Sequence, residues 1–230
     1  MNFNRQQECY IKARSIEGRV LSDEQVKYLP NADIHVKEWK MRKHALSVLT
    51  NYLVDTIAPN SSILDLGCGN GWMSNQISAL GFDLTGMDVN GVEIEQAKRV
   101  FPEVNFHLEN IMNVKNKKFD LVVIAGAFQY FENTEALFLK LKSILNDNGK
   151  LIIMETFFYY DEEIQKAKAA SDSYYKKIGV VEMKDFYFHQ NWNCLSLKKY
   201  RVIYKLNVIF KLLNKMGGTY SPFPIIEVSL

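Results

Sequence analysis

A short apolar run that ends in three closely spaced glycines constrains the fold of this chain more than any other feature. Ile63 to Ile77 reads ILDLGCGNGWMSNQI, in which an apolar segment leads into Gly67, Gly69 and Gly71 and then into a helical pattern. Glycines at such a junction let the backbone turn sharply and approach a ligand closely, because no Cβ intervenes. The start of the following helix offers free N–H groups. The pattern predicts a strand–loop–helix unit that binds a nucleotide-like ligand at the carboxyl end of the strand.

The surrounding chain alternates between predicted strands and helices. We expect strands at 62–66, 82–87, 104–108, 119–125 and 150–155, with helices at 72–80, 92–100 and 134–145 between them. The run at 119–125 is nearly continuous in apolar residues, which is typical of a strand buried on both faces of a parallel sheet. Alternation of this kind predicts an α/β fold with a doubly wound, mostly parallel sheet. Further strands at 200–206 and 221–228 would bring the sheet to seven.

The remaining segments are expected to be helical or irregular. Apolar residues recur at helical spacing from Val36 to about Asp55, with Asn31 or Asp33 as the expected N-cap. Residues 1–30 would form a short helix with an extended tail, and the helix at 134–145 would stop at Asn148-Gly149. Helices are also expected at 162–178, as an insertion after the fifth strand, and at 208–216.

The spacing of the glycines argues against two common kinds of nucleotide-binding site. A dinucleotide fingerprint needs G-x-G-x-x-G, but counting from Gly67 places Trp72 at the third glycine, and counting from Gly69 places Ser74 there. A P-loop needs Gly-Lys-Ser/Thr after the glycines, and the sequence lacks it. The glycine loop is therefore not expected to bind NAD or the phosphates of a nucleoside triphosphate.

Composition excludes several broad classes. Apolar residues make up 47% and charged residues 23% of the 230 residues, which favours a folded domain over disorder, and the net charge of +2 does not by itself imply nucleic acid. The cysteines, Cys9, Cys68 and Cys194, stand far apart without a CxxC pair, so neither a metal site nor a disulfide framework is expected. The polar N-terminal residues and the lack of a long apolar run favour a cytoplasmic location.

The run Asp65-Leu66-Gly67-Cys68-Gly69-Asn70-Gly71 resembles the glycine-rich motif of the class I, Rossmann-like methyltransferases, which use S-adenosylmethionine. The resemblance extends over about residues 60–156. It implies that the loop packs against the amino-acid part of the cofactor, with Asp65 meeting the methionine ammonium. The other residues implied to contact the cofactor are Asp88, Val89, Glu109, Asn110, Ile111, Ala125, Gly126 and Phe128.

Asp88 also has support from its position alone. It ends the second predicted strand, where a carboxylate can accept hydrogen bonds from both ribose hydroxyls. In the resembling family, the acidic position at Glu109-Asn110 often bonds the adenine amino group. Simpler structural roles stay open, because Asp65 could cap the following backbone, Asp88 could serve the turn before Asn90, and the Glu109-Asn110 pair could lie in a solvated loop.

The catalytic residues are not identified by the sequence. Many family members carry a histidine after the fourth strand, where this chain has Gln129-Tyr130-Phe131. Tyr130 and His189 are weak candidates for contact with the acceptor. Methyl transfer to a hydroxyl would need a base, whereas transfer to an amine would not.

The function implied by the resemblance is in-line transfer of a methyl group from S-adenosylmethionine to an oxygen or nitrogen of a small-molecule or glycan-linked acceptor. Three alternatives remain: an RNA or protein methyltransferase, a non-catalytic cofactor-binding subunit and, disfavoured by Trp72, a nicotinamide-dependent reductase. Nucleic acid is the less expected partner, because the motifs for methylation of base amino groups or of cytosine carbon are lacking. Oligomeric state and acceptor are not predicted.

One methyltransferase domain over 1–230 is expected, in three parts. Residues 1–58 would be a helical segment that could fold over the cofactor as a lid, residues 60–156 the cofactor-binding core, and residues 157–230 the acceptor-site elements and closing strands. A basic run from Lys198 to Lys215 has no acidic residue within it. It could contact a membrane surface or an anionic substrate, or it could be a solvated face over buried elements.

Overall fold

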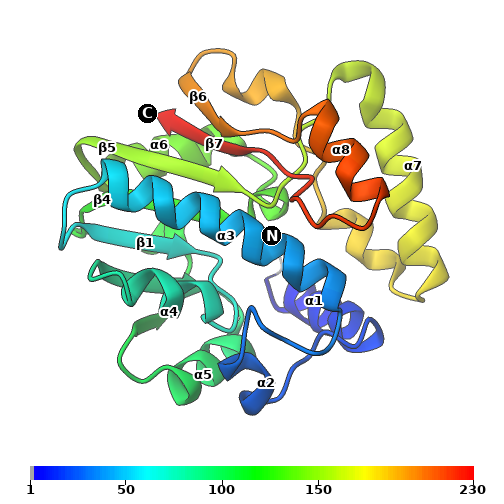
Figure 1. Cartoon of the computed structure of the whole chain (residues 1–230), viewed down its shortest axis with the longest axis horizontal. Helices are drawn as coiled ribbons and strands as arrows, with labels where there is room; N and C mark the ends of the chain where they lie inside the picture. The colour runs from blue at the N-terminus through cyan, green and yellow to red at the C-terminus, as the bar shows by residue number, and fades with distance from the viewer. Residues whose placement is uncertain (1–2) are drawn as a thin grey trace.

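The computed structural model describes residues 3–230, in which seven strands form one sheet in the order β3-β2-β1-β4-β5-β7-β6 (Figure 1). The five strands β1 to β5 run parallel, and β7 pairs antiparallel with both β5 and β6. This arrangement confirms the predicted doubly wound, mostly parallel sheet. The strands are β1 (Ser62–Leu66), β2 (Asp83–Asp88), β3 (Asn105–Leu108), β4 (Phe119–Ala125), β5 (Leu145–Met154), β6 (Lys199–Tyr204) and β7 (Ile225–Ser229).

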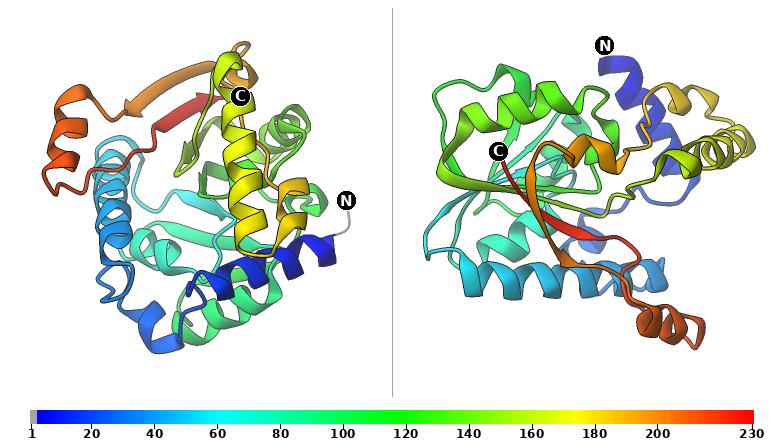
Figure 2. Two further views of the ribbon diagram at one scale, coloured as in Figure 1. Left: turned by 90° about the vertical axis from the view of Figure 1, so that its right-hand side faces the viewer. Right: turned by 90° about the horizontal axis from the view of Figure 1, so that it is seen from above.

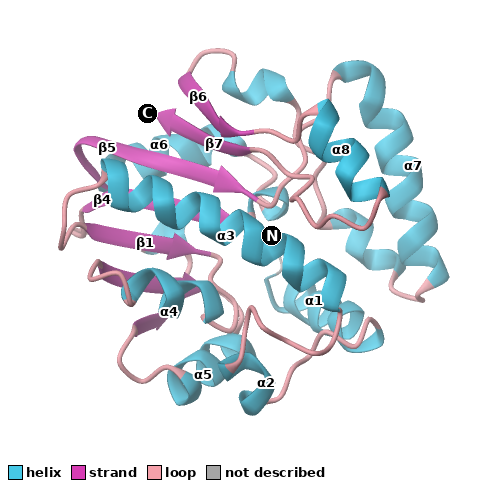
Figure 3. Ribbon diagram, viewed as in Figure 1, coloured by secondary structure: helices cyan, strands magenta, loops and turns pink. Residues whose placement is uncertain are grey.

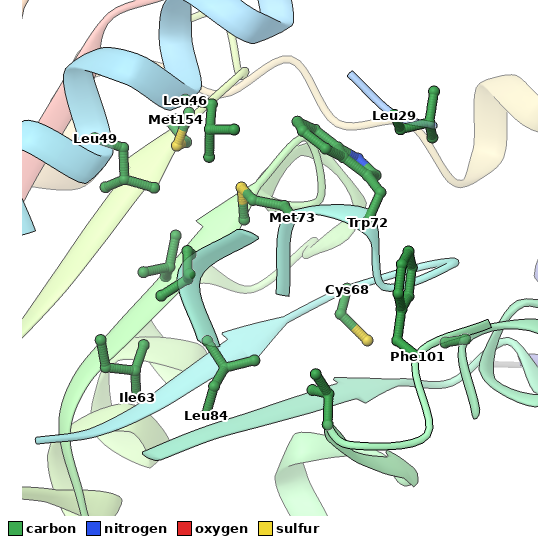
Figure 4. Close-up of a cluster of buried hydrophobic side chains, with 14 of the residues drawn as sticks. Leu29, Leu46, Leu49, Ile63, Cys68, Trp72, Met73, Leu84, Phe101 and Met154 are labelled. Carbon is green, nitrogen blue, oxygen red and sulfur yellow. The ribbon is translucent and has the colours of Figure 1, made fainter. Parts of the chain in front are cut away.

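Helices cover both faces of the sheet, because successive side chains of the central strands point to opposite sides. Ile63 of β1 packs into a cluster that includes Leu49 and Trp72, as Figure 4 shows. Its neighbour Leu64 belongs to a second cluster on the other face, together with Phe138. The first face carries α3 (Val36–Thr56), α4 (Trp72–Ser78) and α5 (Gly91–Val100), and the second carries α6 (Thr134–Ile144).

The remaining helices gather around the ends of the sheet. The arrows of the parallel strands point toward α1 and α7, which lie beyond the carboxyl ends of the strands (Figures 1 and 3). The predicted N-terminal helices and helical insertion after β5 are thus confirmed. Among residues 3–230, no helix combines the length and the apolar character needed to cross a membrane. These helices are α1 (Phe3–Ile16), α2 (Asp23–Lys27), α7 (Asp161–Lys177) and α8 (Val208–Lys215).

The structure corrects two predicted helix boundaries. Neither Asn31 nor Asp33 caps α3, whose N-cap is His35 in a left-handed conformation without a side-chain cap bond. Asn31 instead accepts a hydrogen bond from Lys43 at 2.8 Å. Asn148-Gly149 does not end α6, because the helix ends at Ile144 and β5 begins at the next residue.

Strand pairing explains the early end of α6, and local capping explains one further difference. Leu145 pairs with Phe119 of β4, which draws the chain into the sheet before Asn148, and Asn148 then takes a positive φ of 65° within the strand. The described residues 3–30 hold two helices instead of one with a tail. The second, α2, starts with a capping box in which Ser22 and Gln25 bond reciprocally, a signal that the expectation of an extended tail overlooked.

Candidate cofactor and acceptor sites

A cavity of about 310 Å³ lies where β1, β2 and β4 end, and α1 forms part of its wall. The carboxyl ends of parallel strands meet at this edge, on either side of the point where the strand order reverses between β1 and β4. The position is the one expected for a nucleotide-like ligand. The predicted site residues that line the cavity are Gly67, Gly69, Asp88, Val89, Glu109, Asn110, Ile111, Gly126 and Tyr130.

The glycine loop forms the floor of this cavity next to β1. Its first peptide groups are anchored to β2, because Gly67 N and Cys68 N donate to Met87 O at 2.7 and 3.2 Å. Gly67 has a φ of 80°, and a Cβ built there would lie 2.4 Å from the Cβ of Ala127. A larger residue at 67 would therefore collide with the loop after β4, so the close approach of these two loops depends on this glycine.

Asp88 places a carboxylate in the cavity with a fixed orientation. Its Oδ2 accepts a hydrogen bond from Gly69 N at 2.9 Å, and its Oδ1 accepts one from Asn90 N at 2.8 Å. Burial raises the pKa of Asp88, and these backbone N–H groups oppose the rise by stabilising the charge. Each oxygen keeps a further lone pair, so the side chain can bind a diol without losing its support.

Asp65 lies behind the loop and does not line the cavity. Its Oδ2 accepts a hydrogen bond from Ser74 at 2.6 Å, and its buried Oδ1 has no hydrogen-bond partner among the described residues. Burial raises the pKa of Asp65 to about 7. An unpaired buried oxygen is costly, so this atom is where a donor from a ligand or a bridging water would be most stabilising.

Other predicted residues support the loop from outside the cavity wall. Asn70 is buried and accepts a 3.4 Å hydrogen bond from Trp72 N, while Phe128 is fully buried in the core under α6. Cys68 is also buried, which raises the pKa of its thiol well above the ordinary value, so a reactive thiolate is disfavoured. The predicted site residues outside the cavity lining are Asp65, Cys68, Asn70, Gly71, Ala125, Phe128 and His189.

The far end of the cavity is suited to a flat, partly apolar group. Glu109, Asn110 and Ile111 lie on one side, after β3. Asn110 also caps the short helix after it, because its Oδ1 accepts from Met112 N at 3.0 Å. The opposite wall comes from the segment after β4 and from α6, which the sequence did not indicate. These additional lining residues are Phe131, Glu132, Asn133, Ala136 and Leu137.

Helix α1 forms one wall of the cavity through residues such as Gln7 and Tyr10. Gln7 donates a side-chain hydrogen bond to Val89 O, and Tyr10 packs edge-on against Tyr130 with ring centroids 5.8 Å apart. The guanidinium of Arg14 lies over the Tyr10 ring, and its buried Nε has no hydrogen-bond partner among the described residues. Sequence reasoning did not find these residues, because residues 1–30 lack a strong hydrophobic period.

Glu93 adds a second carboxylate beside Asp88 that the sequence did not single out. It sits in the first turn of α5 and lines the cavity, and a Cβ built on Gly69 would lie 3.0 Å from its Oε2. Burial raises its pKa, and the nearby charge of Asp88 adds to the rise. Two close buried carboxylates resist simultaneous ionisation, which makes this corner of the cavity receptive to hydrogen-bond donors.

The two candidate catalytic residues lie in different places. Tyr130 lines the first cavity, and its contact with the acceptor stays a prediction. His189 does not: its Nε2 is 2.9 Å from Ser171 Oγ of α7, and its ring packs against Tyr159 and Tyr187. Burial lowers the pKa of His189, so the ring favours its neutral form. The structure therefore does not bring this histidine to the cavity.

A second cavity, of about 660 Å³, lies at the end of β5, and it shares no lining residue with the first. Its polar lining includes Glu155 and Arg42, and its apolar lining includes Phe157 and Phe223, whose ring centroids lie 4.4 Å apart. Arg42 Nη1 lies 2.5 Å from Glu155 Oε2. The cavity therefore combines an apolar surface with an ion pair in which Glu155 is buried and Arg42 is partly exposed.

Glu155 and Gly126 separate the two cavities. Gly126 N donates to Met154 O at 3.0 Å, which places the ends of β4 and β5 side by side. A Cβ built on Gly126 would lie 3.4 Å from Glu155 Oε2. The two cavities therefore approach each other where Gly126 lines the first and Glu155 lines the second.

A doubly wound sheet with a glycine loop, a strand-end carboxylate and a cavity at the reversal of strand order defines a Rossmann-like enzyme that binds a nucleotide-like cofactor. Residues 39–192 match the family model described as a methyltransferase domain, so the chain belongs to this methyltransferase family. The predicted family is confirmed, and S-adenosylmethionine is the methyl donor of such domains.

The sequence similarity to curated relatives extends over only part of each protein. The chain is 32% identical over 96 residues to the ubiquinone biosynthesis O-methyltransferase of Rickettsia canadensis, covering 40% of this chain and 41% of that protein. It is 28% identical over 138 residues to the malonyl-[acyl-carrier protein] O-methyltransferase of Bacillus cereus, covering 56% of this chain and 51% of that protein. The chain thus spans about half the length of these relatives or less.

Solved structures agree with the fold over nearly the whole chain. The plantazolicin methyltransferase BpumL, crystallised with a desmethyl-plantazolicin analogue and SAH, superposes with a TM-score of 0.59 at 19% identity and covers 98% of both chains. The YcgJ protein of Bacillus subtilis gives a TM-score of 0.61 at 13% identity, covering 81% of this chain and 97% of that one. At these identities the likeness shows the fold.

Proposed function

We propose that this chain transfers a methyl group from S-adenosylmethionine to an oxygen or nitrogen nucleophile of a small-molecule or glycan-linked acceptor. The observation that carries the proposal is the placement of Asp88 and the glycine loop in one cavity at the carboxyl ends of β1 and β2. The cofactor supplies a methyl group already activated on a sulfonium. The protein then has to align the acceptor with this methyl group and exclude water.

The polar groups of the first cavity fit the parts of the cofactor. Asp88 would accept hydrogen bonds from the ribose hydroxyls, and Glu109-Asn110 would lie beside the adenine. The methionine part is a zwitterion, and two buried atoms just outside the cavity lining, Arg14 Nε and Asp65 Oδ1, have no hydrogen-bond partner among the described residues. Arg14 would pair with the carboxylate, while Asp65 would meet the ammonium directly or through water.

We further propose that the second cavity receives the acceptor. Its apolar part, which includes Phe157 and Phe223, would hold the body of the acceptor, and the nucleophile would reach past Glu155 and Gly126 to the methyl group in the first cavity. Burial raises the pKa of Glu155, although the Arg42 charge works against the rise. A carboxylate with a raised pKa is suited to take a proton from a hydroxyl or to orient an amine. This cavity favours a catalytic domain over a subunit that only binds the cofactor.

Calorimetric titration with S-adenosylhomocysteine tests the proposal. We expect the wild type to bind and the Asp88→Ala variant to bind about 10- to 100-fold more weakly, because two hydrogen bonds to a charged group are lost. Asp83→Ala is the matched control, since Asp83 is an exposed aspartate at the opposite end of the same strand. Asp88→Asn, which retains one acceptor oxygen, shows whether the loop still folds when binding is lost. Failure of the folded wild type to bind would overturn the proposed cofactor site.

A further inference from the structure

Helix α8 turns apolar side chains toward solvent instead of toward the sheet. Val208, Ile209 and Leu212 of the helix and Met216 just beyond its end are 81%, 67%, 59% and 77% exposed. Their spacing of one, four and eight residues from Val208 places them on one side of the helix. We call these four residues the outer stripe. Figure 2 shows α8 at the margin of the molecule, standing away from the sheet in both views.

The opposite side of α8 packs against and hydrogen-bonds to the chain around Tyr220. Phe210 stacks on Tyr220 with ring centroids 4.2 Å apart, and the Asn214 side chain bonds both Tyr220 N and Tyr220 O at 2.9 Å. Asn207 caps the helix start by accepting from Phe210 N at 2.8 Å. The exposure of the outer stripe is therefore a consequence of how the helix is oriented by its contacts with the chain around Tyr220.

The charged residues of the segment that carries the outer stripe have one sign. Lys211 and Lys215 lie on the helix beside the stripe, and Lys205 precedes it. No acidic residue occurs in the sequence between Asp185 and Glu227. An apolar stripe bordered by lysines is the arrangement that lies flat in the interface of an anionic bilayer, where the stripe enters the acyl boundary and the lysines meet headgroups.

We propose that α8 docks this protein on the surface of a membrane that contains anionic lipids. The charge pattern favours a membrane over a second copy of the chain, because pairing two stripes would bring Lys211 and Lys215 of both copies together. Area gives a second argument: a stable protein interface buries about 800 Å² on each partner, more than the exposed side of a two-turn helix offers. The proposal is independent of the cofactor site.

Flotation of the full chain with lipid vesicles tests the proposal. We expect binding to phosphatidylcholine vesicles that contain about 30% phosphatidylglycerol, little binding to phosphatidylcholine alone, and weaker binding as salt rises from about 50 to about 300 mM. The double variant Ile209→Ser/Leu212→Ser should bind at least about tenfold more weakly. Lys211→Gln/Lys215→Gln should lose about fivefold per lysine.

The control is Leu139→Ser, which replaces a leucine that is 64% exposed on α6, and it should bind as the wild type does. All substitutions are at exposed positions, and unfolding curves check that each variant folds. The proposal is wrong if the wild type ignores anionic vesicles, or if the stripe variants bind them equally well. It is also wrong if the stripe variants change a dimer to a monomer in sedimentation while vesicle binding is absent.

Discussion

At the scale of single residues, Glu155 combines features that a purely structural side chain would not need. It takes a positive φ of 54° at the end of β5, a conformation that costs a non-glycine residue about 1 kcal/mol or more. Its carboxylate is buried and paired with Arg42. Strain of this kind persists when the surrounding structure holds it and is often found at functional sites, which supports the proposed role beside the acceptor.

We expect Glu155→Gln to lower the rate of methyl transfer about 100-fold, because an amide cannot take the proton of the nucleophile. Affinity for S-adenosylhomocysteine should stay within about twofold, since Glu155 does not line the first cavity. With wild type, the rate should rise with pH as Glu155 ionises, and the variant should lack this rise. Transfer of labelled methyl groups to a cell extract measures the rates.

The exposed Glu162→Gln variant on α7 is the control for this experiment. An unchanged rate and pH profile in the Glu155 variant would remove Glu155 from the proposed mechanism while leaving the cofactor site intact.

Gly71 is a second residue whose environment makes a sharp prediction. It has a φ of 75°, and a Cβ there would lie 2.4 Å from the Phe106 ring. Gly71→Ala should lower the free energy of unfolding by about 2–4 kcal/mol, because the new methyl group would overpack against Phe106 and an alanine is strained in the left-handed conformation. Gly81 has a φ of 89° but no atom among the described residues within 4 Å of such a Cβ, so Gly81→Ala should cost only about 1 kcal/mol. Equal losses in urea unfolding would show that the Phe106 ring yields freely.

At the scale of secondary-structure elements, one aspartate ties three strands together. Asp120 of β4 accepts hydrogen bonds from Ser62 N and Ser62 Oγ of β1 at 2.8 and 2.9 Å, and from Asn146 of β5 at 2.7 Å. The hydrogen bond from Asn146, followed by those from Ser62, holds the pKa of Asp120 below its ordinary value. The charged form is therefore the one that stabilises the fold.

Because the folded-state pKa of Asp120 is lowered, its contribution is present above the unfolded pKa of about 3.9 and is lost as pH falls through the folded value. Asp120→Asn should lower the free energy of unfolding by about 1 kcal/mol at about pH 7, and the difference should shrink toward zero by about pH 3. Urea unfolding of both proteins across this range measures the effect. A difference that does not change with pH would mean that charge contributes nothing at this position.

The elements were predictable from the sequence where local pattern decides the outcome. The predicted strand at 62–66 matches β1, and the expected helix at 134–145 matches α6 to within one residue. Contacts between segments that are distant in the sequence were not predictable. The position of α1 over the cavity depends on contacts such as Gln7 to Val89, and the pairing of Glu155 with Arg42 joins residues more than a hundred positions apart.

The site residues also fall into those that local sequence predicts and those that distant contacts position. Asp88 and the glycine loop were found because their chemistry follows from their place at strand ends, and these assignments stay predictions that the calorimetric experiment tests. Arg14, Glu93 and Glu155 were not found, because each owes its position to burial and to partners from other elements. The division into a lid segment, a cofactor core and acceptor elements remains a prediction, as does movement of α1.

At the scale of the whole molecule, α8 and the second cavity are joined by one short loop. Tyr220, which holds α8, precedes Ser221 to Phe223, and these residues line the cavity proposed for the acceptor. Docking through α8 would therefore bring this cavity close to the membrane surface. An acceptor with an apolar body could then reach Glu155 without first dissolving in bulk water.

The separation of the two cavities at Gly126 and Glu155 has a kinetic consequence. On the proposed function, donor and acceptor have separate routes, so neither has to leave before the other arrives, and both are present when the methyl group moves. Double-reciprocal plots at several donor concentrations should therefore intersect, and S-adenosylhomocysteine should compete with the donor but not with the acceptor. Parallel lines would instead indicate a methylated enzyme, and direct transfer from donor to acceptor would have to be abandoned.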